Sequence, residues 1–142
     1  MIQKHLKDVL KTALPSLEWS IDTKSASDHT GTVYSEGGPP PGEYEVPNRS
    51  AAYMVYISSS DYSFAQFAGL KAIEILHKRQ GETVEVDYFH NGRFIETKRF
   101  YIQFIRATGE VNVIGIENGV MDVSVNFIAE LIEQKEEITN GT

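Results

Sequence analysis

The alternation of apolar and polar positions in the last third of the chain predicts an antiparallel sheet. Two Asn-Gly pairs, Asn91-Gly92 and Asn118-Gly119, each separate two runs in which apolar and polar residues alternate. Asn and Gly tolerate the positive φ angles that both central positions of a type I′ turn require. Each pair therefore predicts a tight hairpin between the strands on either side of it.

The apolar positions also predict how the strands of these hairpins pair. In the first hairpin, a two-residue turn pairs even-numbered residues before the turn with odd-numbered residues after it. The apolar residues before the turn are even-numbered, so those after it should be odd-numbered, yet the apolar residues from 100 to 104 are even-numbered. Because a shift of one residue moves every side chain to the other face, we expect an extra residue or a strand break within residues 96–99. The second hairpin needs no extra residue, since Ile114 then lies opposite Val123.

Two other segments have the spacing of amphipathic helices. Apolar residues recur every three or four positions over residues 2–13, and Pro15 ends this pattern. A second, longer segment with helical spacing of apolar residues begins after Ser60 or Asp61, and either of these residues can serve as the N-cap. We expect this helix to end at Gly81. We expect one helix at the N-terminus and a long helix in the centre of the chain.

The remaining segments are expected to form strands and loops. Residues 17–21 alternate like a short strand, and the polar run at 22–32 is typical of a loop. Residues 36–47 contain prolines that lack a backbone donor, which predicts a stiff surface loop. Residues 51–58 carry apolar side chains on both faces, which favours a strand in the middle of the sheet, covered on both sides.

Length and composition favour one domain, because 142 residues with 41% hydrophobic content can bury a single core. We expect a single α+β domain over residues 1–132, in which a mainly antiparallel β-sheet is packed by an N-terminal helix and a long central helix. This domain carries the Pro/Gly-rich surface loop. Residues 133–142 are polar, and we expect them to form a flexible tail.

Charge and composition exclude several classes of function. The formal net charge of −7 disfavours tight binding to nucleic acid, which needs a basic patch. The absence of cysteine excludes disulfides and thiolate chemistry. No segment approaches the roughly 20 apolar residues that span a bilayer, and the N-terminal residues lack the apolar core of a signal peptide. We expect a soluble protein that is not exported and has no membrane partner.

Candidate catalytic and metal-binding residues do not form recognisable groups. Residues 27–29 contain the three residue types of a hydrolytic triad, but consecutive residues cannot align nucleophile, base and orienting group, so we interpret them as a polar loop. Prolines after Gly37-Gly38 remove the donors that a phosphate site needs. The histidines have no metal-ligand spacing: His5, His29, His77 and His90. We predict no catalytic residue, no cofactor and no metal site.

Apolar groups on a stiff exposed loop are candidates for contacts with a partner protein, because little ordering entropy is lost when they bind. The residues that we propose for such contacts on and beside the proline-rich loop are Pro40, Tyr44, Val46 and Arg49.

The order of elements resembles a family of tailed-bacteriophage proteins, the minor capsid or tail terminator (tail-completion) proteins. The segments that carry the resemblance are residues 52–58 before the long helix, residues 88–93 in the first hairpin, and residues 115–127 in the second. The family implies a non-enzymatic virion component, assembled in the bacterial cytoplasm as a ring, commonly a hexamer. Such a ring caps the tail tube protein, faces the head-tail connector, and lets DNA pass through its lumen without specific binding.

Two other functions stay open from the sequence. The first is a small enzyme or ligand-binding protein that uses a cleft between the long helix and the sheet, with Asp28, His29 or His90 involved. The second is a head-tail adaptor at another position in the same kind of particle. An enzyme needs polar groups that converge on one site, whereas the candidates here are scattered over loops and turns.

Overall fold

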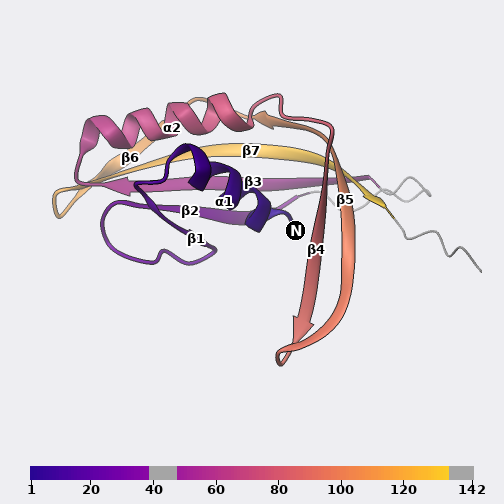
Figure 1. Ribbon diagram of the computed structural model, residues 1–142. Helices are drawn as coiled ribbons and strands as arrows, with labels where there is room; N and C mark the ends of the chain where they lie inside the picture. The colour runs from indigo at the N-terminus through magenta and orange to yellow at the C-terminus, as the bar shows by residue number, and fades with distance from the viewer. Residues whose placement is uncertain (39–47, 135–142) are drawn as a thin grey trace, which may run out of the picture.

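The structure is a computed structural model that describes residues 1–38 and 48–134 (Figure 1). Of these described residues, 55% are in strands and 21% in helices, so the fold is mostly β. Its elements in chain order are α1 (Gln3–Ala13), β1 (Glu18–Ile21), β2 (Thr30–Gly37), β3 (Asn48–Ser59), α2 (Tyr62–Leu76), β4 (Glu82–His90), β5 (Arg93–Ala107), β6 (Asn112–Glu117) and β7 (Val120–Gln134).

The prediction of an α+β domain, in which an N-terminal helix and a long central helix pack the sheet, is wrong, because the fold is mostly β. Strands β5 and β7 have 15 residues each, the same number as α2. A helix rises about 1.5 Å per residue and a strand about 3.3 Å, so α2 is less than about half as long as these strands. The two helices therefore cover only part of a curled seven-stranded sheet, and the sheet dominates the fold.

The sheet has the strand order β1-β2-β3-β7-β5-β4, and β6 pairs with β7 outside this path. The β1–β2 pair is parallel and all other pairs are antiparallel. The segment predicted as the middle strand is β3, which is confirmed as a central strand. Its Tyr53, Val55 and Ile57 are buried, but Met54 and Tyr56 are only half-buried, so the prediction of cover on both sides is wrong.

The prediction of a loop over residues 22–32 fails at its end, because β2 begins at Thr30. Thr30 pairs with Glu18 of β1 and with Ser58 of β3. Trp19 packs over Gly31 on the neighbouring strand, where a Cβ atom would lie 2.5 Å from the indole ring. Pairing with β1 and β3 thus makes the polar residues at the start of β2 part of a buried strand segment.

Both helices lie on one face of the sheet and form the core with it. From α1 come Leu6 and Leu10, both fully buried, as predicted from its apolar spacing. The backbone N–H of Ile2 donates to the Tyr53 hydroxyl at 3.1 Å, which ties the start of α1 to β3. Burial raises the pKa of Tyr53 to about 12, so this phenol stays protonated at neutral pH.

Helix α2 begins where the sequence predicts and ends earlier. Asp61 is the N-cap, and its Oδ1 accepts from the backbone N–H of Phe64 at 3.1 Å. The helix packs through small residues that allow a close approach to the sheet: Ala65, Ala68, Gly69 and Ala72. It ends at Leu76 because His77 is extended, so the predicted stop at Gly81 is wrong.

Both predicted hairpin turns are confirmed, with φ values of 49° and 76° at Asn91 and Gly92 and similar values at the second turn. The extra residue of the first hairpin is Ile95, one position before the predicted range, because Phe94 pairs with Phe89 and the next pair is Glu96 with Tyr88. The second hairpin also contains an extra residue, Ile114, so its predicted unbroken register is wrong.

Candidate functional site

The end of the β4–β5 hairpin projects away from the rest of the molecule (Figure 1). Strand β5 pairs with β7 from Arg99 onward, whereas residues 93–98 pair with β4 alone within the described chain. We call residues 86–98 the distal hairpin. Two paired strands without a third strand or a covering helix are marginally stable in water. Within the described residues, positions 93–98 therefore have no third strand beside them.

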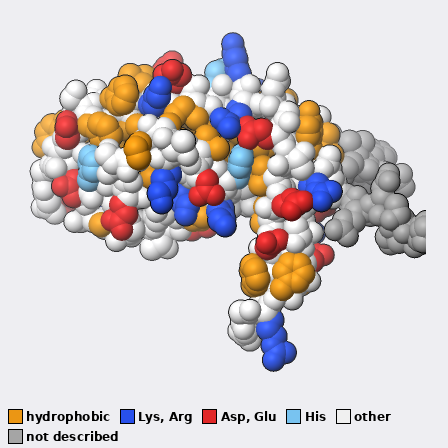
Figure 2. Space-filling view, viewed as in Figure 1, with side chains coloured by type: hydrophobic (Ala, Val, Ile, Leu, Met, Phe, Trp, Pro, Cys, Tyr) orange, Lys and Arg blue, Asp and Glu red, His pale blue; other side chains and the backbone are white. Residues whose placement is uncertain are grey.

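The distal hairpin exposes large apolar side chains. Phe89 and Phe94 are each 60% exposed and Ile95 is 58% exposed. The two phenyl rings contact each other edge to face, with centroids 6.0 Å apart and an angle of 72° between the planes. Figure 2 shows apolar side chains on the projecting part and a basic side chain at its tip. Exposed apolar groups gathered on one projection make it a candidate surface for contacts with another protein.

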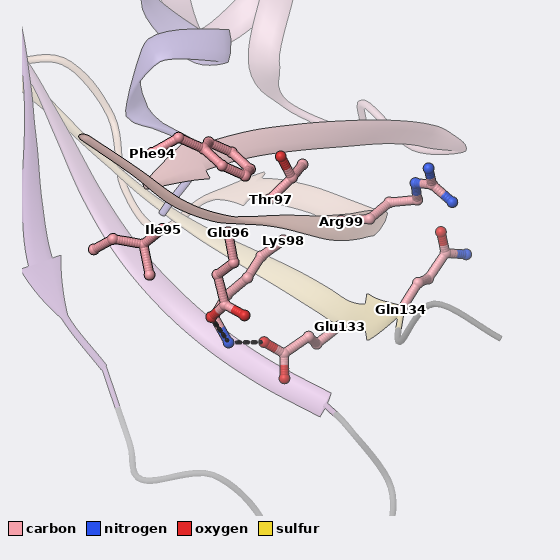
Figure 3. A pocket seen from close by; sticks show the side chains of 8 residues that line it. All are labelled: Phe94, Ile95, Glu96, Thr97, Lys98, Arg99, Glu133 and Gln134. Atoms are coloured by element: carbon pink, nitrogen blue, oxygen red, sulfur yellow. Dashed lines mark hydrogen bonds and ion pairs between the residues drawn. The ribbon is translucent and has the colours of Figure 1, made fainter. Parts of the chain in front are cut away.

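A groove of about 520 Å³ lies at the base of the distal hairpin (Figure 3). Its centre is an ion-pair cluster in which Lys98 Nζ lies 3.1 Å from Glu133 Oε1 and 3.5 Å from Glu96 Oε1. On the other side of Glu133, Arg49 Nη2 lies 3.5 Å from Oε2. These contacts connect β5, β7 and β3 at the base of the distal hairpin.

The charges of this cluster change two pKa values. Partial burial by itself would raise the pKa of Glu133, but the hydrogen bond and charge of Lys98, with the charge of Arg49, lower it below its ordinary value. The hydrogen bond and charge of Glu133 raise the pKa of Lys98. Glu133 is therefore ionised in the folded protein over a wider pH range than in the unfolded chain.

We predict that Glu133→Gln weakens the fold slightly and makes it less sensitive to acid. A carboxylate whose pKa is lowered by folding stabilises the folded state above its unfolded pKa, and this stabilisation is lost as the pH falls through the folded pKa. Solvent screens the pair, so the expected loss at pH 7 is below about 1 kcal/mol. Urea denaturation at pH 7 and at pH 3 measures it, and a larger difference from wild type at pH 3 would contradict it.

Only one of the four partner-contact residues predicted from sequence lies in the described part of the chain. Pro40, Tyr44 and Val46 fall within residues 39–47, outside the described residues. Arg49 lies in β3 and pairs with Glu133, so it sits at the base of the distal hairpin. Phe89, Phe94 and Ile95 flank a predicted turn and are exposed, but they were not among the contact residues predicted from sequence.

A second exposed apolar surface lies where α2 meets β6. Gly69 of α2 approaches Val111, which directly precedes β6, so that a Cβ at Gly69 would lie 2.9 Å from Val111 Cγ1. Val113 and Ile116 pair with Val123 and Met121, whose side chains are buried on the helix side of the sheet. Val113 and Ile116 are about half exposed, and so are Phe67 and Leu70 of α2, where the Phe67 ring lies 6.1 Å from the ring of Phe64.

The polar residues considered for an enzyme serve as structural links. His29 Nδ1 lies 3.0 Å from the buried Ser59 Oγ, which also accepts from the backbone N–H of Asp61. Asp28 accepts from both the hydroxyl and the backbone N–H of Ser60, and these hydrogen bonds lower the pKa of Asp28. The contacts hold the start of β2 against the β3–α2 junction. His90 lies at the distal turn, so the structure does not bring it to the other two candidates.

Two further features of the described residues bear on cofactors and membranes. In residues 1–38 and 48–134, no group of three or more His, Asp or Glu side chains could hold a metal ion. Neither of the two helices described is long and apolar enough to cross a membrane.

Comparison with known proteins leaves the chain without an assigned family. Neither a protein-family model nor a curated protein matches it. The resemblance to phage tail terminators, which depends on the order of the elements, therefore stays a prediction.

Proposed function

We propose that this chain is a structural subunit that assembles with copies of itself into a ring, in the role of a tail terminator or minor capsid protein at the head-tail junction of a phage-like particle. The observation that supports the proposal is the distal hairpin, a two-stranded projection that exposes Phe89, Phe94 and Ile95. Packing these side chains against another subunit would bury apolar area that the described part of the chain leaves exposed.

The proposed neighbours follow from the same role. One rim of the ring contacts the tail tube protein and the other contacts the head-tail connector. The net charge of −7 fits a lumen that repels the DNA backbone, so that DNA passes without specific binding. An adaptor elsewhere in the same particle would use the same kind of contact between copies.

The assembled mass tests the proposal. We expect wild-type protein to form oligomers whose mass rises with concentration in sedimentation experiments, and annular particles in negative-stain images. The triple variant Phe89→Ser, Phe94→Ser, Ile95→Ser is expected to weaken self-association more than about a hundredfold, because central apolar residues contribute most of the binding energy of an interface.

The matched control is the double variant Tyr62→Ser, Phe104→Ser, which removes exposed aromatic side chains outside the distal hairpin. It should assemble as wild type does, and circular dichroism should show both variants folded. A wild-type protein that stays monomeric at the highest attainable concentration, both alone and with isolated tail tubes, would refute the proposal.

A further inference from the structure

We propose that Asn91, at the tip of the distal hairpin, is a site of spontaneous deamidation, which converts its side-chain amide to a carboxylate. Asn91 and the following Gly92 are both exposed. Asn before Gly suits this reaction, because Gly has no side chain to block the approach to its backbone nitrogen. The same pair of residues recurs in the second hairpin as Asn118-Gly119, and again at Asn140-Gly141, which lies outside the described residues.

The reaction involves only two residues and water. The backbone nitrogen of Gly92 loses its proton to a base in solution and attacks Cγ of Asn91, which forms a new N–C bond. The side-chain nitrogen takes one proton from solvent and leaves as ammonia, so that a five-membered succinimide ring remains. Water then opens the ring at Cγ, which gives aspartate, or at the main-chain carbonyl, which gives isoaspartate. The ring-closing step has the advantage of an intramolecular reaction.

The closed turn holds the two reacting atoms apart. The φ angles are 49° at Asn91 and 76° at Gly92, as in a two-residue hairpin turn. In the left-handed conformation ψ is about +47°, which directs the Gly92 nitrogen away from the Asn91 side chain. The succinimide therefore forms only when the end of the hairpin opens and Asn91 leaves this conformation. The rate of deamidation then depends on how often the turn opens.

The two Asn-Gly turns differ in how the neighbouring strands hold them. Residues 93–98, which follow the first turn, pair with β4 alone within the described chain. Met121, two residues after the second turn, is buried and pairs with β6 on one side and with β3 on the other. Two strands without a third are marginally stable, and fraying segments open at little cost in free energy. We therefore expect Asn91 to react faster than Asn118.

Modification of Asn91 changes the part of the hairpin where Phe89 and Phe94 contact each other. In isoaspartate the main chain runs through the former side chain, which adds a CH2 group to the backbone of a tight turn. Phe89 and Phe94 pair directly beside this turn, with ring centroids 6.0 Å apart, so their contact depends on its geometry. If these rings contact a neighbouring subunit, a modified subunit binds its neighbour less tightly. This consequence depends on the proposed function, whereas the assignment of Asn91 does not.

Peptide mapping by mass spectrometry tests the assignment on monomeric wild-type protein at neutral pH. Aspartate and isoaspartate should accumulate at Asn91 at least about tenfold faster than at Asn118, a ratio that corresponds to about 1.4 kcal/mol in the free energy of opening. In urea, where both turns are open, the two rates should be similar. Phe94→Ser removes the ring contact, so it should speed the reaction at Asn91 and leave Asn118 unchanged. A rate at Asn118 that equals or exceeds the rate at Asn91 in the folded protein would overturn the assignment.

A variant that cannot lose this amide tests the consequence for assembly. Asn91→Gly is expected to keep the turn, because Gly-Gly is also favoured in type I′ turns. After long incubation, wild type should lose at least about tenfold in self-association affinity, measured by sedimentation, while Asn91→Gly keeps the affinity of fresh protein. Aged wild type that is modified at Asn91 and assembles like fresh protein would overturn the consequence alone. A wild-type protein that never assembles would refute the proposed function, and peptide mapping would still decide the assignment.

Discussion

Replacing Phe127 by alanine is expected to lower the free energy of unfolding by about 3–5 kcal/mol, the usual cost of removing a buried aromatic side chain. Phe127 is 1% exposed and lies in β7, where it pairs with Tyr53 of β3 and Ala107 of β5. Phe127 therefore lies on a strand that is paired on both edges, which limits how far the backbone can move to fill the space left by its ring. Since small domains are stable by about 5–15 kcal/mol, Phe127→Ala removes a large part of the total.

Urea denaturation followed by circular dichroism measures this loss, and Phe89→Ala is the matched control. The control removes the same atoms from a side chain that is 60% exposed, so a change within about 0.5 kcal/mol is expected. The comparison should be made at a protein concentration where wild type is monomeric, because assembly adds stability. Equal losses in the two variants would contradict the placement of Phe127 in the core.

Leu6→Asp is the second substitution with a large expected effect, a loss of about 3–5 kcal/mol from an unpaired carboxylate in an apolar site. Leu6 is fully buried where α1 packs on the sheet. The protein can avoid burying the charge by releasing α1, which exposes Leu10 and breaks the hydrogen bond from Ile2 to Tyr53. Hydrogen exchange should then show that α1 loses protection while β3 and β7 keep most of theirs.

Lys4→Asp is the control on the same helix. Lys4 is exposed, and a carboxylate near a helix N-terminus is favourable, so this variant should be as stable as wild type. If Leu6→Asp left the exchange of α1 unchanged, the packing of α1 against the sheet would be wrong.

A few consecutive residues were sufficient to predict where α2 begins and where the two hairpins turn. Asp61 caps α2, and the two Asn-Gly pairs make tight turns, because these features depend on a few consecutive residues. The fold class was wrong because apolar periodicity identifies a helix without showing how much of a sheet it covers. The bulges at Ile95 and Ile114 depend on pairing with distant strands, so single-strand patterns could place one of them only approximately.

The candidate surface was harder to predict than the fold. Phe89 and Phe94 flank a predicted turn, but alternation shows only which face a side chain occupies. Whether that face is exposed depends on which other elements pack on it, and no local pattern contains that information. Arg49 was predicted beside a loop, and its pairing with Glu133 arises from the β3–β7 register.

The position of β7 also has a consequence for synthesis of the protein. Strand β7 is the last described element in the chain, yet it lies in the middle of the sheet, between β3 on one edge and β5 and β6 on the other. While a ribosome is still making residues 120–134, the β1–β2–β3 and β4–β5 units have no strand to join them. Completion of the core therefore waits for the final strand, which favours slow folding and gives chaperones time to bind the separate halves.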